Sequence, residues 1–252
     1  TYHETIYNVL INILNKKISS IELIIIVFDF FCFIQKKYMS NLTLIIPAKN
    51  EKESLPKVLE ELKNFNLKKK IILESSDKLT IQSIENHDCK IIYQDFVGYG
   101  DALIKGIQSV DTEFFCIFNA DGSFDPNELK TMINKIENGK YDFVFASRYE
   151  KNCGSDDDTL ITFVGNYIFT SLGKIFFRLK ITDILYTYVM ARTSSAKKLN
   201  LISKDFSFCV ELPIKASRAN LKICTSESYE RPRIGGKKKV NAFKDGFKIL
   251  LS

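Results

Sequence analysis

The chain has 252 residues, of which 45% are hydrophobic, so it can bury a substantial core and disorder is not expected. Lysine and arginine number 36 against 30 acidic residues, a mild excess that suits an anionic partner and gives no indication of nucleic-acid binding. The six cysteines form no C-x-x-C pair and there are two histidines, which disfavours zinc, a disulfide framework and histidine-dependent nucleophilic catalysis. This cysteine pattern is typical of buried thiols in a reducing, cytosolic compartment.

The first 40 residues differ from the rest of the chain. The segment 21–34 is strongly apolar, but it contains Glu22 and Asp29 and is shorter than the ~20 residues that a membrane helix needs. It also has no cleavage site after a basic start, so a secretory signal is not expected. We interpret residues 1–40 as a helical packing or interfacial segment, and it remains open whether they are the tail of a preceding domain.

From residue 41 onward, apolar runs of strand length alternate with stretches of helical periodicity. The expected strands are 42–46, 70–73, 90–93, 114–118, 143–146 and 221–228, and the later helices are 159–179, 206–219 and 242–251. Strands that alternate with helices at this pitch predict an α/β fold with a mostly parallel, doubly wound sheet. The helices 206–219 and 242–251 are expected to be the C-terminal amphipathic helices of this fold.

The stretch 114–126 changes abruptly from apolar to polar where its strand is expected to end. The oxygen-bearing side chains of Asn119, Asp121 and Ser123 are two residues apart, so they can converge on one hard cation at the carboxyl edge of the sheet. The alternative is an Asx turn at Asp125 that starts the next helix, because Asp before Pro is a good N-cap.

Polar or glycine-rich loops follow four successive strands, and parallel strands would bring all of them to the same edge. The loops are Pro47-Ala48-Lys49-Asn50-Glu51, Glu74-Ser75-Ser76-Asp77, Gly98-Tyr99-Gly100-Asp101-Ala102 and Asn119-Ala120-Asp121. In this order they resemble family-two glycosyltransferases of the GT-A fold, and within them the polyprenyl-phosphate branch that includes dolichyl-phosphate mannosyltransferase. The resemblance begins near Leu42 and ends near Leu250, so residues 41–252 are expected to form one GT-A-like (Rossmann-like) domain.

This resemblance implies a pocket for a UDP- or GDP-linked nucleotide-sugar. Its residues would be Pro47, Ala48, Asn50, Glu51, Glu74, Asp77, Gly98, Gly100, Asp101, Asn119, Ala120 and Asp121. The family's D-x-D motif binds Mg²⁺ or Mn²⁺, which implies Asp121, Asn119 and Ser123 as ligands. The chain has Asn119 where the first Asp is expected, so metal affinity should fall while the geometry survives. For Asn50, a helix N-cap is the simpler alternative.

Further motifs of the same family implicate residues around the leaving group and the acceptor. Ser147-Arg148-Tyr149 matches a strand-end S-R-Y, so Arg148 would help to hold phosphate, as would Arg231 in a segment that resembles R-x-x-G-x-S-K. Asp183 aligns with an acceptor-side carboxylate, although the residues after it depart from the family pattern. The acceptor or phosphate loop would include Glu211, Arg233 and Lys237. The alternatives are a surface ion pair for Arg148, a turn for Asp183 and a helix surface charge for Glu211.

The implied reaction is an inverting transfer of a sugar from the nucleotide-sugar to a polyprenyl phosphate. A lipid phosphate is already an anion and needs no base, whereas a hydroxyl acceptor would need a carboxylate such as Asp183. Two alternatives stay open. One is a family-two transferase with a saccharide hydroxyl acceptor in polysaccharide or glycolipid assembly, and the other is a nucleotide-sugar-binding protein without turnover.

Two features predict a position at the cytoplasmic face of a membrane. The helix 159–179 has apolar residues around most of its circumference, and the segment 231–248 carries seven basic residues and one acid. Apolar surface and a basic cluster together are the signals that peripheral attachment to anionic lipid generally requires. The sequence gives no indication of the oligomeric state.

Overall fold

The computed structural model describes residues 41–151 and 153–235. The described residues do not include the segment 1–40, the expected helix 242–251, Lys237 or most of the basic segment 231–248.

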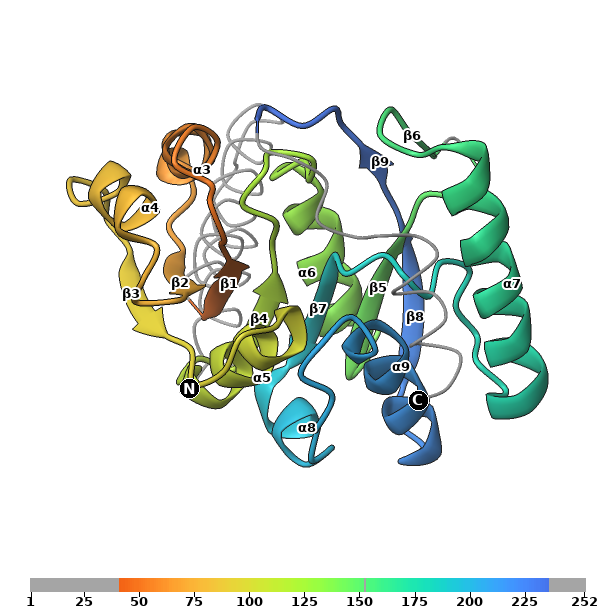
Figure 1. Ribbon diagram of the computed structural model, residues 1–252. Helices are drawn as coiled ribbons and strands as arrows, with labels where there is room; N and C mark the ends of the chain where they lie inside the picture. The colour runs from red at the N-terminus through yellow and green to blue at the C-terminus, as the bar shows by residue number, and fades with distance from the viewer. Residues whose placement is uncertain (1–40, 152, 236–252) are drawn as a thin grey trace, which may run out of the picture. The chain divides into compact units, whose positions relative to one another are not determined.

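A seven-stranded sheet forms the centre of the described domain, in the order β3-β2-β1-β4-β7-β5-β8 (Figure 1). The strands are β1 (Leu42–Pro47), β2 (Lys68–Leu73), β3 (Lys90–Tyr93), β4 (Phe114–Ile117), β5 (Phe143–Ser147), β7 (Val189–Arg192) and β8 (Ile223–Glu227). Within this sheet β7 runs antiparallel to both neighbours, and every other pairing is parallel. The predicted mostly parallel α/β sheet is therefore confirmed.

Helices flank the sheet on both faces. They are α3 (Leu55–Glu61), η1 (Leu62–Asn64), α4 (Lys78–Ser83), α5 (Tyr99–Ser109), α6 (Glu128–Asn138), α7 (Leu160–Phe177), α8 (Thr193–Lys197) and α9 (Phe208–Arg218). Figure 1 shows α5, α8 and α9 in front of the sheet and α6 behind it. A second, two-stranded sheet pairs β6 (Gly154–Ser155) with β9 (Tyr229–Glu230).

The core on the α5, α8 and α9 side is built from every second residue of the strands, because successive side chains of a strand point to opposite faces. Ile45, Phe115 and Phe143 belong to this cluster and are fully buried. Helix α5 approaches the sheet closely at Gly106, where an added Cβ would lie 2.3 Å from Ile45 Cγ2 and 3.2 Å from Ile72 Cγ1.

Three local expectations differ from the structure. Asn50, for which a helix N-cap was the alternative, lies at φ 53 in the left-handed region, and the helix that follows begins at Leu55 with Ser54 as its N-cap. Asp125 forms the alternative Asx turn, in which Asn127 N donates to Asp125 Oδ1 at 2.9 Å, but α6 begins only at Glu128. Strand β7 was not expected at all.

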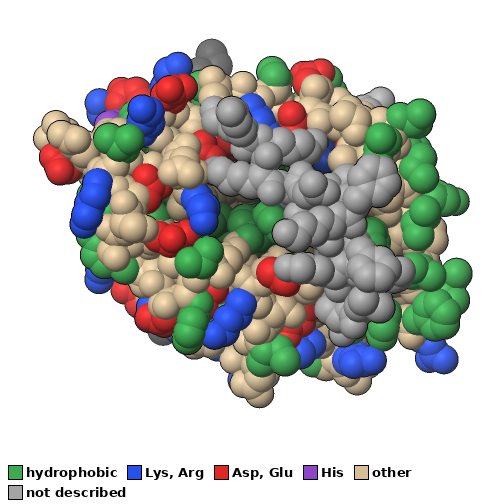
Figure 2. All heavy atoms as spheres, viewed as in Figure 1, with side chains coloured by type: hydrophobic (Ala, Val, Ile, Leu, Met, Phe, Trp, Pro, Cys, Tyr) green, Lys and Arg blue, Asp and Glu red, His purple; other side chains and the backbone are tan. Residues whose placement is uncertain are grey.

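Helix α7 has its polar residues inside and its apolar residues outside. The buried face consists of Asn166, Thr170 and Gly173. The large apolar side chains that remain exposed are Leu160, Ile161, Phe163, Val164, Tyr167, Ile168, Ile175 and Phe176. Figure 2 shows hydrophobic side chains gathered along this helix, at the right edge of the view. By length and composition α7 could also cross a membrane, but its polar buried face packs against the rest of the domain.

Gly106→Ala should destabilise the fold by about 1–3 kcal/mol, because the new methyl group overpacks the contact between α5 and β1. Gly165→Ala in α7 is the matched control, since an added Cβ there meets nothing within 4 Å. It should stabilise the protein by about 0.5–1 kcal/mol through helix propensity alone. Urea unfolding of both variants measures the difference, and equal stability of Gly106→Ala and wild type would contradict the close packing.

Candidate active site

The carboxyl ends of the parallel strands and the start of β7 meet at one edge of the sheet, because β7 runs in the opposite direction. A cavity of about 580 Å³ opens at this edge. Its walls come from the loops after β1 to β5, from the start of α7, and from segments at 185–187 and 230–233. Of the residues selected from the sequence, those that line it are Pro47, Ala48, Glu51, Glu74, Gly98, Asn119, Ala120, Asp121, Arg148 and Arg233.

A smaller hollow of about 130 Å³ shares part of the wall of the cavity. Asn50 and Asp77 line it, and Asn50 N donates to Asp77 Oδ2 at 2.7 Å. Lys49 and Glu74, which line both spaces, form an ion pair of 2.7 Å at the boundary. The two spaces together place the predicted residues of the β1 and β2 loops side by side.

The glycine-rich loop after β3 takes its shape from a close approach to another backbone segment. Gly98 has φ +155, and a Cβ at this position would lie 2.1 Å from the carbonyl oxygen of Lys204. Gly100 is equally close to the carbonyl oxygen of Ser203. Asp101 is buried and accepts a hydrogen bond of 3.0 Å from Phe96 N. Gly98 therefore lines the cavity, whereas Gly100 and Asp101, which were expected to contact the donor, hold the loop in place.

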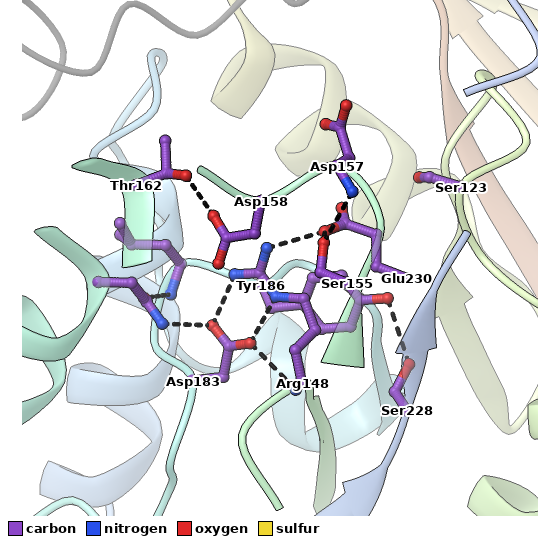
Figure 3. A network of polar contacts seen from close by, with 12 residues as sticks. Ser123, Arg148, Ser155, Asp157, Asp158, Thr162, Asp183, Tyr186, Ser228 and Glu230 are labelled. Atoms are coloured by element: carbon purple, nitrogen blue, oxygen red, sulfur yellow. Dashed lines mark hydrogen bonds and ion pairs between the residues drawn. The ribbon is translucent and has the colours of Figure 1, made fainter. Parts of the chain in front are cut away.

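Arg148 follows β5, and its guanidinium is held between two carboxylates (Figure 3). Its Nε donates to Asp183 Oδ2 at 2.7 Å, its Nη2 to Asp183 Oδ1 at 3.0 Å and its Nη1 to Glu230 Oε2 at 2.9 Å. Burial opposes the charge, but Asp183 and Glu230 outweigh it and raise the pKa of Arg148 above its ordinary value. Arg148 is therefore a fixed, permanent cation at the cavity wall.

The carboxylate of Asp183 is saturated with donors. Its side chain is 0% exposed, and besides the guanidinium it accepts hydrogen bonds from Arg148 N at 3.2 Å and Asn166 Nδ2 at 2.8 Å. It is not part of the cavity wall. The structure thus places Asp183 where it positions Arg148, and an acceptor-side role for Asp183 stays a prediction.

Asp121, at the end of the loop after β4, is held by contacts at both oxygens. Its Oδ1 accepts from Ser123 N at 3.0 Å and from Ser123 Oγ at 2.7 Å, and its Oδ2 forms an ion pair of 3.0 Å with Arg233 Nη1. Arg233 Nε also bonds Asp157 Oδ2 at 3.3 Å. Ser123 is fully buried and outside the cavity wall, so it orients Asp121 rather than facing a ligand as expected.

The register of the segment 231–234 decides which arginine faces the cavity. Arg231 N donates to Ser123 O at 2.9 Å and Ile234 N donates to Asp121 O at 2.8 Å. Gly122 between these partners has φ +84, and a Cβ there would lie 2.4 Å from Ile234 Cδ1. Glycine is thus required at this position for both conformation and space.

The contacts of Arg231 lie outside the cavity, and its expected role at phosphate stays a prediction. Its Nη1 and Nη2 bond the carboxylate of Glu61 at 2.6 and 3.0 Å, and Nη2 also donates to Phe124 O at 2.6 Å. Arg231 does not line the cavity, whereas Arg233, two residues further on, does. Of the two arginines expected to hold phosphate, the structure places Arg233 and not Arg231 in the cavity wall.

Glu211 has a structural role in the described chain, contrary to its expected place near the acceptor. It accepts hydrogen bonds from Ile202 N at 2.9 Å and Ser203 N at 2.8 Å and pairs with Lys215 at 2.7 Å. Burial raises the pKa of Glu211, but these hydrogen bonds outweigh it and leave the pKa below its ordinary value. Glu211 thus fixes the loop against which Gly100 packs.

The sequence profile described as Glycosyl transferase family 2 matches residues 43–199. The chain belongs to glycosyltransferase family 2. An uncharacterized glycosyltransferase of Mycobacterium tuberculosis is 25% identical over 199 residues, which cover 79% of this chain and 89% of that protein. The low-salt glycan biosynthesis hexosyltransferase Agl6 of Haloferax volcanii is 22% identical over 214 residues, or 82% of this chain and 52% of that protein. The chain is therefore a glycosyltransferase enzyme of this family.

Solved structures show the same fold. Glucosyl-3-phosphoglycerate synthase from M. tuberculosis, solved with Mn²⁺, UDP and glucosyl-3-phosphoglycerate, superposes with a TM-score of 0.63 at 12% identity, covering 78% of this chain and 72% of that one. The same enzyme with Mg²⁺ and UDP gives a TM-score of 0.61, covering 81% and 76%. The expected GT-A-like architecture of a family 2 glycosyltransferase is thereby confirmed.

A divalent metal fits this site only in part. In residues 41–151 and 153–235 no group of three or more His, Cys, Asp or Glu side chains could hold a metal on its own. Asp121 and Asn119 both line the cavity and provide one charged and one neutral oxygen donor. Mg²⁺ and Mn²⁺ prefer several oxygen ligands, so these two residues would hold an ion only together with further oxygens, such as those of a bound diphosphate.

Several cavity residues of this family 2 enzyme were not selected from the sequence. Glu230 lies next to Arg231, and Asp157 and Asp158 belong to an acidic run that reads as a solvated surface. A signal was present for Asn166, because Thr162, Asn166 and Thr170 recur every four residues within an apolar helix. Such a polar stripe predicts a face that packs on polar partners.

Asp183→Asn should destabilise the protein by about 3–5 kcal/mol, because it removes the main partner of a buried guanidinium. Asp157→Asn is the matched control: its side chain is 23% exposed and its bond to Arg233 is longer, so less than about 1 kcal/mol is expected. Urea unfolding gives both values. In the double variant Asp183→Asn, Arg148→Met the loss of unfolding free energy should be smaller than in Asp183→Asn alone. Equal losses in Asp183→Asn and Asp157→Asn would show that Arg148 does not depend on Asp183.

Proposed function

We propose that this glycosyltransferase moves a sugar, with inversion, from a UDP- or GDP-linked nucleotide-sugar to a polyprenyl phosphate at the cytoplasmic face of a membrane. The observation that carries the acceptor side is α7, which lines the cavity with Thr162 and Asn166 while its apolar side faces outward. A lipid whose phosphate enters the cavity would find an apolar surface for its chain on the same helix.

The donor side rests on the composition of the cavity. The loops after β1 and β4 carry small residues, Ala48 and Ala120, so a ligand can approach the strand ends closely. Arg148 and Arg233 also line the cavity and provide positive charge. The glucosyl-3-phosphoglycerate synthase structures contain UDP with Mn²⁺ or Mg²⁺, which supports a nucleoside diphosphate and a divalent ion here as well.

In the proposed reaction, an acceptor phosphate oxygen forms a bond to the anomeric carbon while the bond from that carbon to the nucleoside diphosphate breaks. The electron pair of the broken bond stays on the diphosphate, and no proton has to move. Arg148 and Arg233 would stabilise the charge that develops on the leaving group, because they are preorganised cations in a partly enclosed site. Asp121 and Asn119 would hold a divalent ion, which would supply further positive charge to the same diphosphate.

A saccharide hydroxyl is the second candidate acceptor. It would need a base, and Asp157 and Asp158 both line the cavity. Asp158 already accepts hydrogen bonds from Tyr149 Oη at 2.5 Å and from Thr162 Oγ1. The similarity to Agl6, a hexosyltransferase of glycan biosynthesis, supports sugar transfer without distinguishing the two acceptors.

Transfer assays with radiolabelled UDP- and GDP-sugars test this function. Product should form on a polyprenyl phosphate in vesicles and not on saccharides, and Asp157→Asn and Asp158→Asn should each reduce the rate less than about tenfold, since no base is required. Transfer to a saccharide that falls by ~10² to 10⁴ in Asp157→Asn or Asp158→Asn would instead identify the hydroxyl acceptor.

Asp121→Ala should abolish metal-dependent binding of UDP or GDP in calorimetry.

The membrane position is tested by co-sedimentation with anionic liposomes. Ile161, Ile168 and Ile175 recur every seven residues on the exposed side of α7, so changing all three to Gln should weaken binding by roughly tenfold or more. Ile202→Gln is the control, because Ile202 is 74% exposed but lies outside α7. Equal sedimentation of the triple variant and wild type would remove α7 from the membrane contact.

A further inference from the structure

The Arg233 guanidinium forms an ion pair with the oxygen of Asp121 that a cation in the cavity would need. Oδ1 of this carboxylate is engaged by the backbone and hydroxyl of Ser123, so Oδ2 is the oxygen that meets Arg233 Nη1, at 3.0 Å. The Asp121 side chain is only 8% exposed. An arriving cation therefore has to displace the guanidinium rather than bind beside it.

Asn119, two residues before Asp121, strengthens the competition between Arg233 and a metal ion for the Asp121 carboxylate. Asn119 contributes an amide instead of a second carboxylate, so Asp121 carries the single formal negative charge of the Asn119, Asp121, Ser123 group. Arg233 is shared between Asp121 and Asp157, and it offsets charge on Asp121. A divalent ion that approached Oδ2 of Asp121 would also meet this guanidinium, which disfavours the ion by like-charge repulsion.

A diphosphate can remove this obstacle. Arg233 is held from two walls of the cavity, by Asp121 on the loop after β4 and by Asp157 before α7 at the longer distance of 3.3 Å. Its side chain is 22% exposed and reaches the cavity, so a bound anion can contact it. Phosphate oxygens accept two parallel hydrogen bonds from a guanidinium, which makes a diphosphate a stronger partner than one carboxylate oxygen.

We propose that Arg233 makes divalent-metal binding conditional on the diphosphate of the donor: without a nucleoside diphosphate it blocks Asp121, and with one it turns to the phosphate and releases that carboxylate. This rests on the proposed donor class. Coupling of this kind is reciprocal, so the metal raises the affinity for the nucleoside diphosphate by the same factor as the diphosphate raises the affinity for the metal. Arg233 is then the residue that sets the size of that factor.

Binding of MnCl₂ to the full chain, measured by the electron paramagnetic resonance signal of free Mn²⁺, tests the proposal without turnover. Arg233→Gln should bind Mn²⁺ alone about tenfold more tightly than wild type, the order expected when one charged hydrogen bond no longer competes. Arg233→Lys keeps the charge and should stay near wild type. Lys49→Gln is the matched control, because it removes a cation from the cavity wall that pairs with Glu74 and not with Asp121.

The same titrations in saturating UDP and then GDP measure the coupling. Wild type should gain more Mn²⁺ affinity from the nucleotide than Arg233→Gln does, by about the tenfold factor that the variant has already gained without it. Equal Mn²⁺ affinity of wild type and Arg233→Gln without nucleotide, or a gain in Lys49→Gln as large as in Arg233→Gln, overturns the proposal. If neither nucleotide binds to wild type, the proposed donor class fails, and the first comparison still decides whether Arg233 competes for Asp121.

Discussion

A buried guanidinium is the constraint on which the rest of this site depends. Arg148 has an 11% exposed side chain, so its charge needs partners from the protein, and these come from distant parts of the chain. Asp183 precedes β7 and Glu230 belongs to β9, while Asn166 of α7 bonds the same Asp183. One charge thereby connects α7, the entry to β7 and the end of the described chain to the central sheet.

Ion pairs within the cavity determine what kind of ligand it can accept. Lys49 pairs with Glu74, Arg233 with Asp121, and Arg148 with Asp183 and Glu230. A ligand with a single charge would gain little by replacing such partners, because each protein pair is already close and oriented. An anion with several oxygens can satisfy more than one of these cations at once, and this favours a diphosphate over a simple carboxylate.

The sequence was sufficient to locate β1 to β5 and the loops that follow them, because each strand contains a short apolar run that ends at turn residues. The start of β2 was missed by two residues, because this strand opens with three lysines. It was not sufficient for β7, whose four residues include Arg192 and whose antiparallel direction depends on tertiary pairing. Nor could it decide between Arg231 and Arg233, since the choice depends on a backbone register that local composition does not encode. The burial of Asp183 could not be predicted either, because the sequence does not distinguish a buried, fully hydrogen-bonded aspartate from an aspartate in a turn.

The late position of Glu230 and Arg233 in the chain has a consequence for biosynthesis. The last strand of the sheet ends at Glu227, so a nascent chain that has emerged to this point holds every strand of the central sheet. It still lacks one partner of Arg148 and the guanidinium opposite Asp121, both of which arrive within the next six residues. A chain that ended at that point would therefore contain the strands of the central sheet but not the two residues that complete these ion pairs of the cavity.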